Sequence, residues 1–547
     1  MGAQDFTGIV RRAVDSERLS GLFEKAMNDK WLTLQNSLLV CFSLYSAYWL
    51  VVYIYRVTLH PLAKFPGPVL AGVSFWYEFY YDVWPRRYGY MWKIEELHKK
   101  YGPIVRINPI HIHINDPNFI DQIYAPAGRE KRNGDPWFSM ATESGMMAWS
   151  TLQTMDHHQH HLRRGALSRF FSKASVRQLE GLISDKIDRL LQRLAQMHRA
   201  GDSVINSTHV IAALTMDIIS SYSLGVDMGN LTREEWGRDW SETFPRLGTI
   251  RPWGRQFKNL TVMSLSIEPS IVRWFNPTAA AVAEKAKYPM EVIRAHIDKH
   301  EKDGATTNMA TNNRTIFMEI LDSSLPPHEK SVGRLNAEAF LLLGGGTDPT
   351  TRNLTVTMYH LLANPKLLQR LLDELKLIMP RPDSPVTVAA LEALPFFSAC
   401  ITEGLRMTNA VSTRMPRVSP DKAIVYKDWV IPKGTPVMQS LYLLHMNDDI
   451  FPEPMRYNPQ RWLDNPSLKS RYLMAFGRGS RQCLGINLAN AEMFLTLARV
   501  LTRFDLGLYD VIRERDIDVS GDCFNGIVRD DSPGIRVKLL RDNLAEI

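Results

Sequence analysis

Residues 476–485, which read FGRGSRQCLG, decide the fold class of this chain of 547 residues. They precede the largely apolar stretch 486–500, whose spacing of hydrophobic residues predicts a helix, so Cys483 lies just before a helix start. Unpaired backbone N–H groups and the helix dipole favour a thiolate over a thiol at such a position. We therefore predict a cysteine that acts as a ligand rather than an inert buried one.

The residues around Cys483 suit a flat, anionic prosthetic group. Gly479 and Gly485 have no Cβ, so the backbone can pass close to a planar ligand there. Arg481 offers a planar guanidinium that matches a carboxylate. These features together indicate haem, whose iron takes a thiolate and whose propionates need cations.

The same stretch matches the pattern Phe-x-x-Gly-x-Arg-x-Cys-x-Gly at every fixed position. This pattern is the haem-loop signature of the cytochrome P450 family, which the chain resembles over nearly its whole length. The resemblance implies a mainly α fold with a minor β part, haem b with Cys483 as its metal ligand, and Phe476 beside the haem. Stretches such as 60–71, 101–107 and 445–452 resemble the fungal microsomal branch, especially the trichodiene-oxygenase-like enzymes of secondary metabolism.

A second motif, Glu403-x-x-Arg406, lies upstream of the haem loop, with Arg461 between them in the sequence. By itself an acid and a base three residues apart on a helix indicate little, because surface pairs of this kind are common. The resemblance implies that Glu403, Arg406 and Arg461 form the structural triad that braces the loop. We interpret them as structural, since a buried ion network is costly to break and lies away from the reaction.

Residues 156–164, DHHQHHLRR, contain four histidines and allow two interpretations. A zinc site is one, although histidines spread around a single helix do not converge on one metal ion. The resemblance implies instead that His160 and Arg164 face a haem propionate. It also implies that Arg414 is a further propionate partner, although Asn409 replaces a proline that is common in relatives.

Residues 337–354 have an apolar helical pattern that three consecutive glycines and Pro349 interrupt. Such breakers could mark a loop between two helices. The resemblance implies instead the family's long central helix, bent over the haem, with Gly345 and Gly346 leaving room for dioxygen. Pro349 cannot donate a hydrogen bond to the carbonyl of Gly345, which leaves that carbonyl available to water.

Pro349 also occupies the position at which relatives carry a threonine that helps to protonate bound oxygen. Asp348 keeps the acidic position, and Thr347 and Thr350 lie close to it in the sequence. We hypothesise that Asp348 with Thr350 or Thr347, or a hydroxyl group of the substrate, organises the water that delivers protons.

The N-terminal part predicts a membrane anchor. Residues 32–55 contain no charge and are dense in apolar and aromatic residues, and roughly 20 such residues cross a bilayer. A buried core helix and a cleaved signal peptide are the weaker alternatives. We divide the chain into an N-terminal segment (1–31), a transmembrane anchor (32–56), a proline-rich hinge (57–70) and a haem-thiolate catalytic domain (71–547).

Within the catalytic domain, periodicity predicts helices and a few short strands. Helices are expected over 175–197, 351–377 and 397–407, and strands over 104–107, 111–114, 422–439 and 535–539. Substrate is expected to contact loops near 140–150 and 411–413.

Composition narrows the function further. The net charge of +7 suits an anionic membrane surface or an acidic partner, but equally simple solubility, and no tract or signature predicts nucleic-acid binding. Four cysteines without a disulfide or zinc spacing favour a reducing compartment.

The resemblance implies a single-pass protein of the endoplasmic reticulum membrane whose catalytic domain faces the cytosol. It implies NADPH-cytochrome P450 reductase, and possibly cytochrome b5, as partners, besides membrane lipid and a hydrophobic terpenoid or polyketide-like substrate. Two alternatives stay open: a haem-thiolate isomerase or dehydratase that needs no external electrons, and a non-catalytic haem-binding membrane protein.

Overall fold

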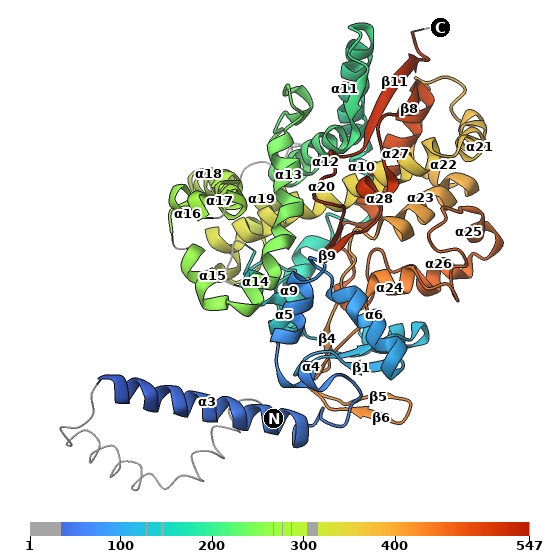
Figure 1. The fold of residues 1–547 in the computed structure, drawn as a ribbon. Coiled ribbons are helices and arrows are strands. Elements are labelled where there is room, and N and C mark those ends of the chain that lie inside the picture. The colour runs from blue at the N-terminus through green and yellow to red at the C-terminus, as the bar shows by residue number, and fades with distance from the viewer. Residues whose placement is uncertain are drawn as a thin grey trace.

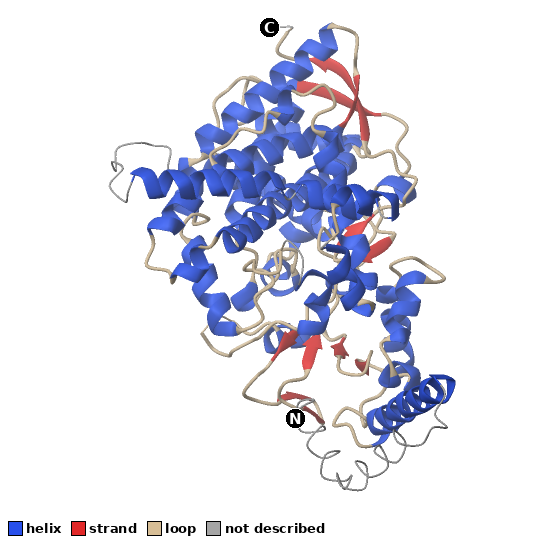
Figure 2. Cartoon of the chain, turned by 90° about the vertical axis from the view of Figure 1, so that its left-hand side faces the viewer, coloured by secondary structure: helices blue, strands red, loops and turns tan. Residues whose placement is uncertain are grey.

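The computed structural model describes residues 34–126, 128–143, 147–265, 267–275, 277–285, 287–303 and 315–545. Helices make up most of it and the strands are short, which confirms the expected class, mainly α with a minor β part (Figures 1 and 2). The segment expected before the anchor, 1–31, and the first two residues expected in the anchor lie outside the described residues.

The helices of the N-terminal half are α3 (Leu34–Thr58), α4 (Val69–Val73), α5 (Trp76–Val83), α6 (Tyr90–Tyr101), α7 (Ile120–Ile123), α8 (Pro136–Glu143), α9 (His157–Ser168), α10 (Lys173–Gln178), α11 (Glu180–Arg199), α12 (Ser207–Leu224), α13 (Arg238–Leu247), α14 (Arg251–Gln256), α15 (Lys258–Leu265) and α16 (Pro269–Phe275). Those of the C-terminal half are α17 (Pro277–Lys285), α18 (Lys287–Asp303), α19 (Ile316–Asp322), α20 (Val332–Leu362), α21 (Pro365–Lys376), α22 (Val388–Glu392), α23 (Pro395–Thr408), α24 (Leu441–His445), α25 (Gln460–Asp464), α26 (Ser467–Tyr472), α27 (Ile486–Arg503) and α28 (Arg513–Asp516).

Four small sheets accompany the helices. Their strand orders are β1-β2-β7-β4, β3-β11-β8, β5-β6 and β10-β9. The bounds are β1 (Ile104–Arg106), β2 (Ile112–Ile114), β3 (Val204–Asn206), β4 (Arg417–Val418), β5 (Ile424–Tyr426), β6 (Trp429–Ile431), β7 (Pro436–Met438), β8 (Phe504–Leu508), β9 (Gly521–Cys523), β10 (Asn525–Ile527) and β11 (Arg536–Asp542). Strands lie in each of the stretches predicted to contain them, and β1 pairs antiparallel with β2.

Helix α20 lies in the middle of the body, where α12, α23 and α27 pack against it (Figure 1). It is one continuous helix of 31 residues through the three glycines and Pro349, so the interpretation as a loop is wrong. Packing compensates for the weak helix propensity of these residues, because the face of α20 towards α12 is buried in the main hydrophobic core.

Two of the predicted helices are interrupted. The stretch 175–197 falls on α10 and α11, which are separated at Leu179, and 351–377 covers the end of α20 and all of α21. The second break has a clear cause, because Asn364 caps α21 with its side chain and Pro365 occupies the first helical position. Periodicity alone missed both breaks since the apolar spacing continues across them.

Helix α3 projects from the body and exposes large apolar side chains such as Phe42 and Tyr45 (Figure 1). The segment Leu39–Thr58 of this helix is long and apolar enough to cross a membrane, and none of its residues is buried against the rest of the chain. A buried core helix is therefore excluded. Within the described residues, α3 alone meets these criteria.

Candidate active site

A cavity of about 340 Å³ lies between α20, α27 and the loop 476–485. The thiol of Cys483 opens into it. Much of its wall is apolar, contributed by Phe138, Ile219, Leu341, Leu342, Val411, Met415, Phe476, Leu488 and Phe524. Of the two loops expected to contact substrate, 411–413 contributes Val411 to the cavity wall. In the loop 140–150, residues 147–150 do not line the cavity, and 144–146 lie outside the described residues.

The loop that carries Cys483 is held by its own backbone. The amide of Cys483 donates a hydrogen bond to the carbonyl of Phe476 at 2.8 Å, which closes the loop. Burial raises the pKa of the Cys483 thiol, while the backbone N–H of Gly485 and the charge of Arg164 lower it. The helix start thus contributes in the expected direction but does not outweigh burial.

The two glycines of this loop have different roles. Gly485 lines the cavity, and a Cβ at this position would meet nothing within 4 Å, as expected for close approach to a planar ligand. Gly479 has a φ of +78°, and a Cβ there would lie 2.5 Å from the carbonyl oxygen of Ala125. The expectation for Gly479 is therefore corrected: it permits a left-handed turn packed on another backbone segment.

Four cationic or titratable side chains gather at one part of the cavity wall: His160, Arg164, Arg417 and Arg481. The guanidinium of Arg164 donates to the carbonyl of Gln482 at 2.7 Å, and that of Arg481 donates to the carbonyls of Thr154 and Met155, both at 2.7 Å. Arg417 likewise donates to a backbone carbonyl.

Among the described residues, no carboxylate forms an ion pair with the three arginines of this cluster. Burial, followed by the charges of Arg481, Arg164 and Arg417, lowers the pKa of His160 to about 3, so this imidazole is neutral. A group with two carboxylates would supply the missing negative charge, and the cluster therefore fits the haem propionates. The zinc interpretation gains no support, since the described residues hold no group of three or more potential metal ligands.

Arg414 was expected to bind a propionate, but it does not line the cavity. That expectation is therefore wrong. Its guanidinium forms a buried ion pair with Glu78 of α5, to which Arg255 also pairs at 2.8 Å. Burial alone would raise the pKa of Glu78, but Arg414 and Arg255 lower it to about 2. Arg417, three residues later, takes the position at the cavity wall.

Glu403, Arg406 and Arg461 form the expected network behind the loop. Arg406 donates two hydrogen bonds to the Glu403 carboxylate at 2.8 and 2.9 Å, and Arg461 donates one at 3.1 Å. Trp462 and the amide of Asn458 donate to the same carboxylate. Because Glu403 and Arg406 are fully buried, loss of either partner would leave a costly unpaired charge.

His445 connects this network to the cysteine loop. Its carbonyl accepts a hydrogen bond from Arg406 at 2.8 Å, and its Nε2 accepts one from the amide of Met474 at 3.0 Å. Nδ1 consequently carries the proton and donates to Oδ1 of Asn409 at 3.2 Å. Asn409 also caps α23 with a φ of +44°, which proline could not adopt.

On α20 the side chains diverge. Gly345 and Thr350 line the cavity, and nothing lies within 4 Å of a Cβ built on Gly345. Gly346 also borders the cavity, but its Cβ would lie 2.7 Å from Cγ1 of Ile219, so its main role is contact with α12. Thr347 is buried with its hydroxyl 3.6 Å from the sulfur of Met216 and does not reach the cavity, contrary to its expected role.

The position of Asp348 also departs from the expectation. It accepts a hydrogen bond from Asn525 and does not line the cavity. Burial raises the pKa of its carboxyl, while Arg352 and Asn525 lower it.

Two polar residues of the cavity wall were missed. Oε2 of Glu492 and Oδ1 of Asn353 are buried there without a hydrogen-bond partner among the described residues. Burial raises the pKa of Glu492 well above its usual range, which favours the protonated form of this carboxyl. The sequence held one signal, an acidic residue inside the apolar helix that follows Cys483.

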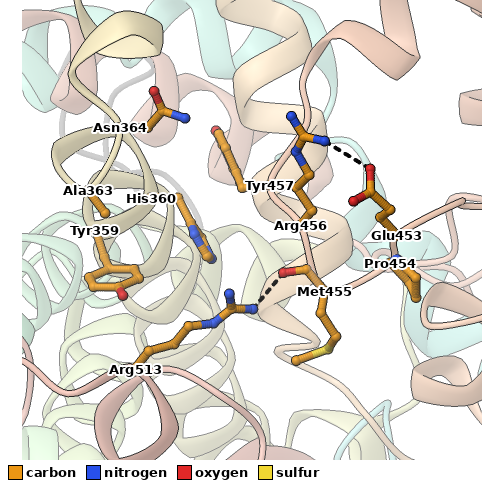
Figure 3. A pocket seen from close by; sticks show the side chains of 10 residues that line it. All are labelled: Tyr359, His360, Ala363, Asn364, Glu453, Pro454, Met455, Arg456, Tyr457 and Arg513. Carbon is orange, nitrogen blue, oxygen red and sulfur yellow. Dashed lines mark hydrogen bonds and ion pairs between the residues drawn. The ribbon is translucent and has the colours of Figure 1, made fainter.

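A second hollow lies at the C-terminal end of α20 (Figure 3). Arg456 pairs with Glu453 at its edge, and Arg513 donates to the carbonyl of Met455. It contains neither a cysteine nor any residue that the sequence predicted for the site. The cavity at Cys483 is therefore the candidate active site.

The sequence model of the cytochrome P450 family matches residues 71–533, which include every element around this cavity. This chain belongs to the cytochrome P450 family. Cytochrome P450 monooxygenase MO6277 of Ascocoryne sarcoides is 37% identical over 88% of this chain and 95% of its own. Monooxygenase astB of Talaromyces wortmannii is 40% identical over 83% of this chain and 85% of its own. Monooxygenase TRI4 of Trichoderma arundinaceum is 36% identical over 85% of this chain and 88% of its own.

These relatives confirm the resemblance to fungal P450 monooxygenases of secondary metabolism. The family uses haem with thiolate ligation and takes electrons from NADPH through a reductase. The cation cluster, the open backbone at Gly345 and Gly485 and the thiol of Cys483 all fit this cofactor.

Proposed function

We propose that this P450 is anchored by α3 in the endoplasmic reticulum membrane, with its catalytic domain in the cytosol, and oxidises a hydrophobic terpenoid or polyketide-like metabolite. The partners that we propose are NADPH-cytochrome P450 reductase, cytochrome b5 and membrane lipid. The observation that carries the proposal is the largely apolar cavity into which Cys483 opens beneath α20. Such a cavity binds an apolar molecule and excludes bulk water beside the sulfur.

The residues of the cavity would hold the cofactor in a defined orientation. Cys483 would bind the iron, and His160, Arg164, Arg417 and Arg481 would bind the propionates. When bound, haem supplies the activation of dioxygen for insertion of one oxygen atom into the substrate. The triad of Glu403, Arg406 and Arg461 would keep the cysteine loop in place through His445.

We further propose that Thr350 and Glu492 organise the protons that this reaction consumes. Thr350 lines the cavity from α20, and Glu492, whose pKa burial raises well above its usual range, lines it from α27. Asn353 lines the cavity too: its Nδ2 donates to the carbonyl of Pro349 at 3.1 Å, and its Oδ1 is buried without a partner among the described residues.

The test uses the full chain in membrane vesicles with the reductase. We expect the ferrous carbon-monoxide complex to show the red-shifted band of thiolate ligation, and Cys483→Ser to lose it. We also expect fungal extracts with and without the gene to differ by an oxidised metabolite that forms only with NADPH, reductase and dioxygen. A product that forms without NADPH would favour the isomerase or dehydratase instead.

A further inference from the structure

Arg251, the first residue of α14, extends its side chain to the wall of the active-site cavity. Its guanidinium carbon lies 4.9 Å from the ring centroid of Phe138 and 4.8 Å from that of Phe524. The ring centroids of Phe138 and Phe524 are themselves 6.5 Å apart. The cation is thus held between residues of α8 and of the β9–β10 connection, and cation–π contacts with two rings fix its orientation.

Arg251 retains unused hydrogen-bond donors. One amino group donates to the carbonyl of Phe138 at 3.2 Å, and this is the one hydrogen bond of its guanidinium among the described residues. Arg251 is only partly buried, and it lines the cavity. A guanidinium has five N–H donors, so the described residues leave most of its hydrogen-bonding capacity unused.

The neighbouring acids are engaged elsewhere. Asp522 accepts hydrogen bonds from the hydroxyl of Ser412 at 2.9 Å and from the amide of Phe524 at 3.2 Å. Glu78 and Asp82 pair with Arg255, one turn further along α14, at 2.8 and 3.0 Å. Within the described part of the chain no carboxylate forms an ion pair with Arg251, although the charge of Asp522 acts on it and raises its pKa.

Arg251 remains a cation despite its surroundings. Burial and the nearby charge of Arg255 lower its pKa to about 9, which still leaves it protonated at neutral pH. Holding an unpaired cation in a largely apolar cavity is unfavourable, and an anionic ligand would remove that cost.

This cation is separate from the set that fits the haem propionates. The propionate cluster comes from α9, β4 and the loop 476–485, whereas α14 packs against α5 and α8. Two propionates already face His160 and three arginines in the proposed arrangement. The partner of Arg251 is therefore expected to arrive with the substrate.

We propose that Arg251 pairs with a carboxylate of the substrate, so that this P450 acts on apolar carboxylic acids. A carboxylate accepts two parallel hydrogen bonds from a guanidinium, which matches the free donors of Arg251. The pair would hold the acidic end of the molecule at α14, and the apolar remainder would extend along the walls formed by α20 and α27. This inference rests on the proposed monooxygenase function and specifies its substrate class.

The test compares three probes on the haem-loaded full chain: dodecanoic acid, its methyl ester and dodecanol. Affinities are measured by calorimetry and by the shift of the haem absorption band. We expect the acid to bind at least tenfold more tightly than the alcohol or the ester. Arg251→Gln should abolish this preference, Arg251→Lys should retain part of it, and the exposed control Arg381→Gln should retain all of it.

Equal affinity for the three probes, binding of none of them, or an unchanged preference in Arg251→Gln would contradict the assignment. If Arg251→Gln does not load haem, the wild-type preference and Arg251→Lys still decide the question. The carbon-monoxide band and NADPH-dependent turnover of the same preparation report on the proposed function separately.

Discussion

Arg414 and Glu78 form a buried ion pair that links the segment after α23 to α5. Both side chains are about 3% exposed, and Arg255 joins them from α14. The pair fixes one face of the extended segment that begins beyond α23, and Arg417 projects from the same segment to the cavity wall. One short stretch thus contributes both a buried ion pair and a cation at the cavity wall.

Arg414→Gln and Arg417→Gln should therefore have different effects. Loss of Arg414 leaves the buried charge of Glu78 with one partner, and we expect the free energy of unfolding to fall by about 3 kcal/mol. Loss of Arg417 should mainly lower the haem content per polypeptide. Thermal unfolding and haem absorbance of both variants check this, and a loss of haem by Arg414→Gln without loss of stability would contradict it.

Gly345→Ala and Gly346→Ala should have different effects, because the first fills space in the cavity and the second disturbs the packing of α20 on α12. The methyl group at 346 would lie 2.7 Å from Ile219, and overpacking of this kind costs about 1–3 kcal/mol. The methyl group at 345 meets only the cavity, so stability should hold or rise by up to about 1 kcal/mol through helix propensity, while ligands bind less well. Melting temperatures and haem spectral titrations measure both effects, and equal destabilisation of the two variants would refute the distinction.

Thr350→Ala should lower the yield of product per NADPH consumed, because its hydroxyl lies at the cavity wall. Thr347→Ala is the matched control, since its hydroxyl contacts Met216 away from the cavity. We expect a several-fold loss of coupling for the first variant and little change for the second. Parallel measurements of NADPH oxidation, product and peroxide provide the check, and the reverse order would assign the proton path to the other face of α20.

Mild acid should destabilise the catalytic domain through its buried neutral histidines. Burial lowers the pKa of His98 to about 4, and burial followed by Arg406 lowers that of His445 to about 3. The unfolded chain takes up these protons near pH 6.5 and the folded chain does not, so stability falls as the pH drops from about 6.5 to about 4. The loss is on the order of 3 kcal/mol for His98 alone.

His98→Gln should flatten this dependence, and the exposed His161→Gln should leave it unchanged. The apparent unfolding midpoint between pH 7 and pH 4 is the readout. Parallel pH curves for the wild type and His98→Gln would show that the histidine does not carry the effect.

The sequence by itself determined the features that depend on residue identity in a short stretch. The cysteine loop 476–485 and the triad of Glu403, Arg406 and Arg461 lie as the motifs predicted. The reason is that ligand chemistry and buried ion pairing require particular side chains at fixed spacing. The helical class and the exposed apolar helix α3 followed from periodicity and length.

Only the tertiary structure decided which side chains face the cavity. Arg414 and Arg417 are three apart in an extended segment, so they point to opposite faces, and contact with α5 selected the face. Helix α20 packs on α12 in an orientation that places Thr350 at the cavity, whereas Thr347 contacts α12. Arg251 and Glu492 gained their positions from elements distant in the sequence, because a cavity forms only when those elements pack together.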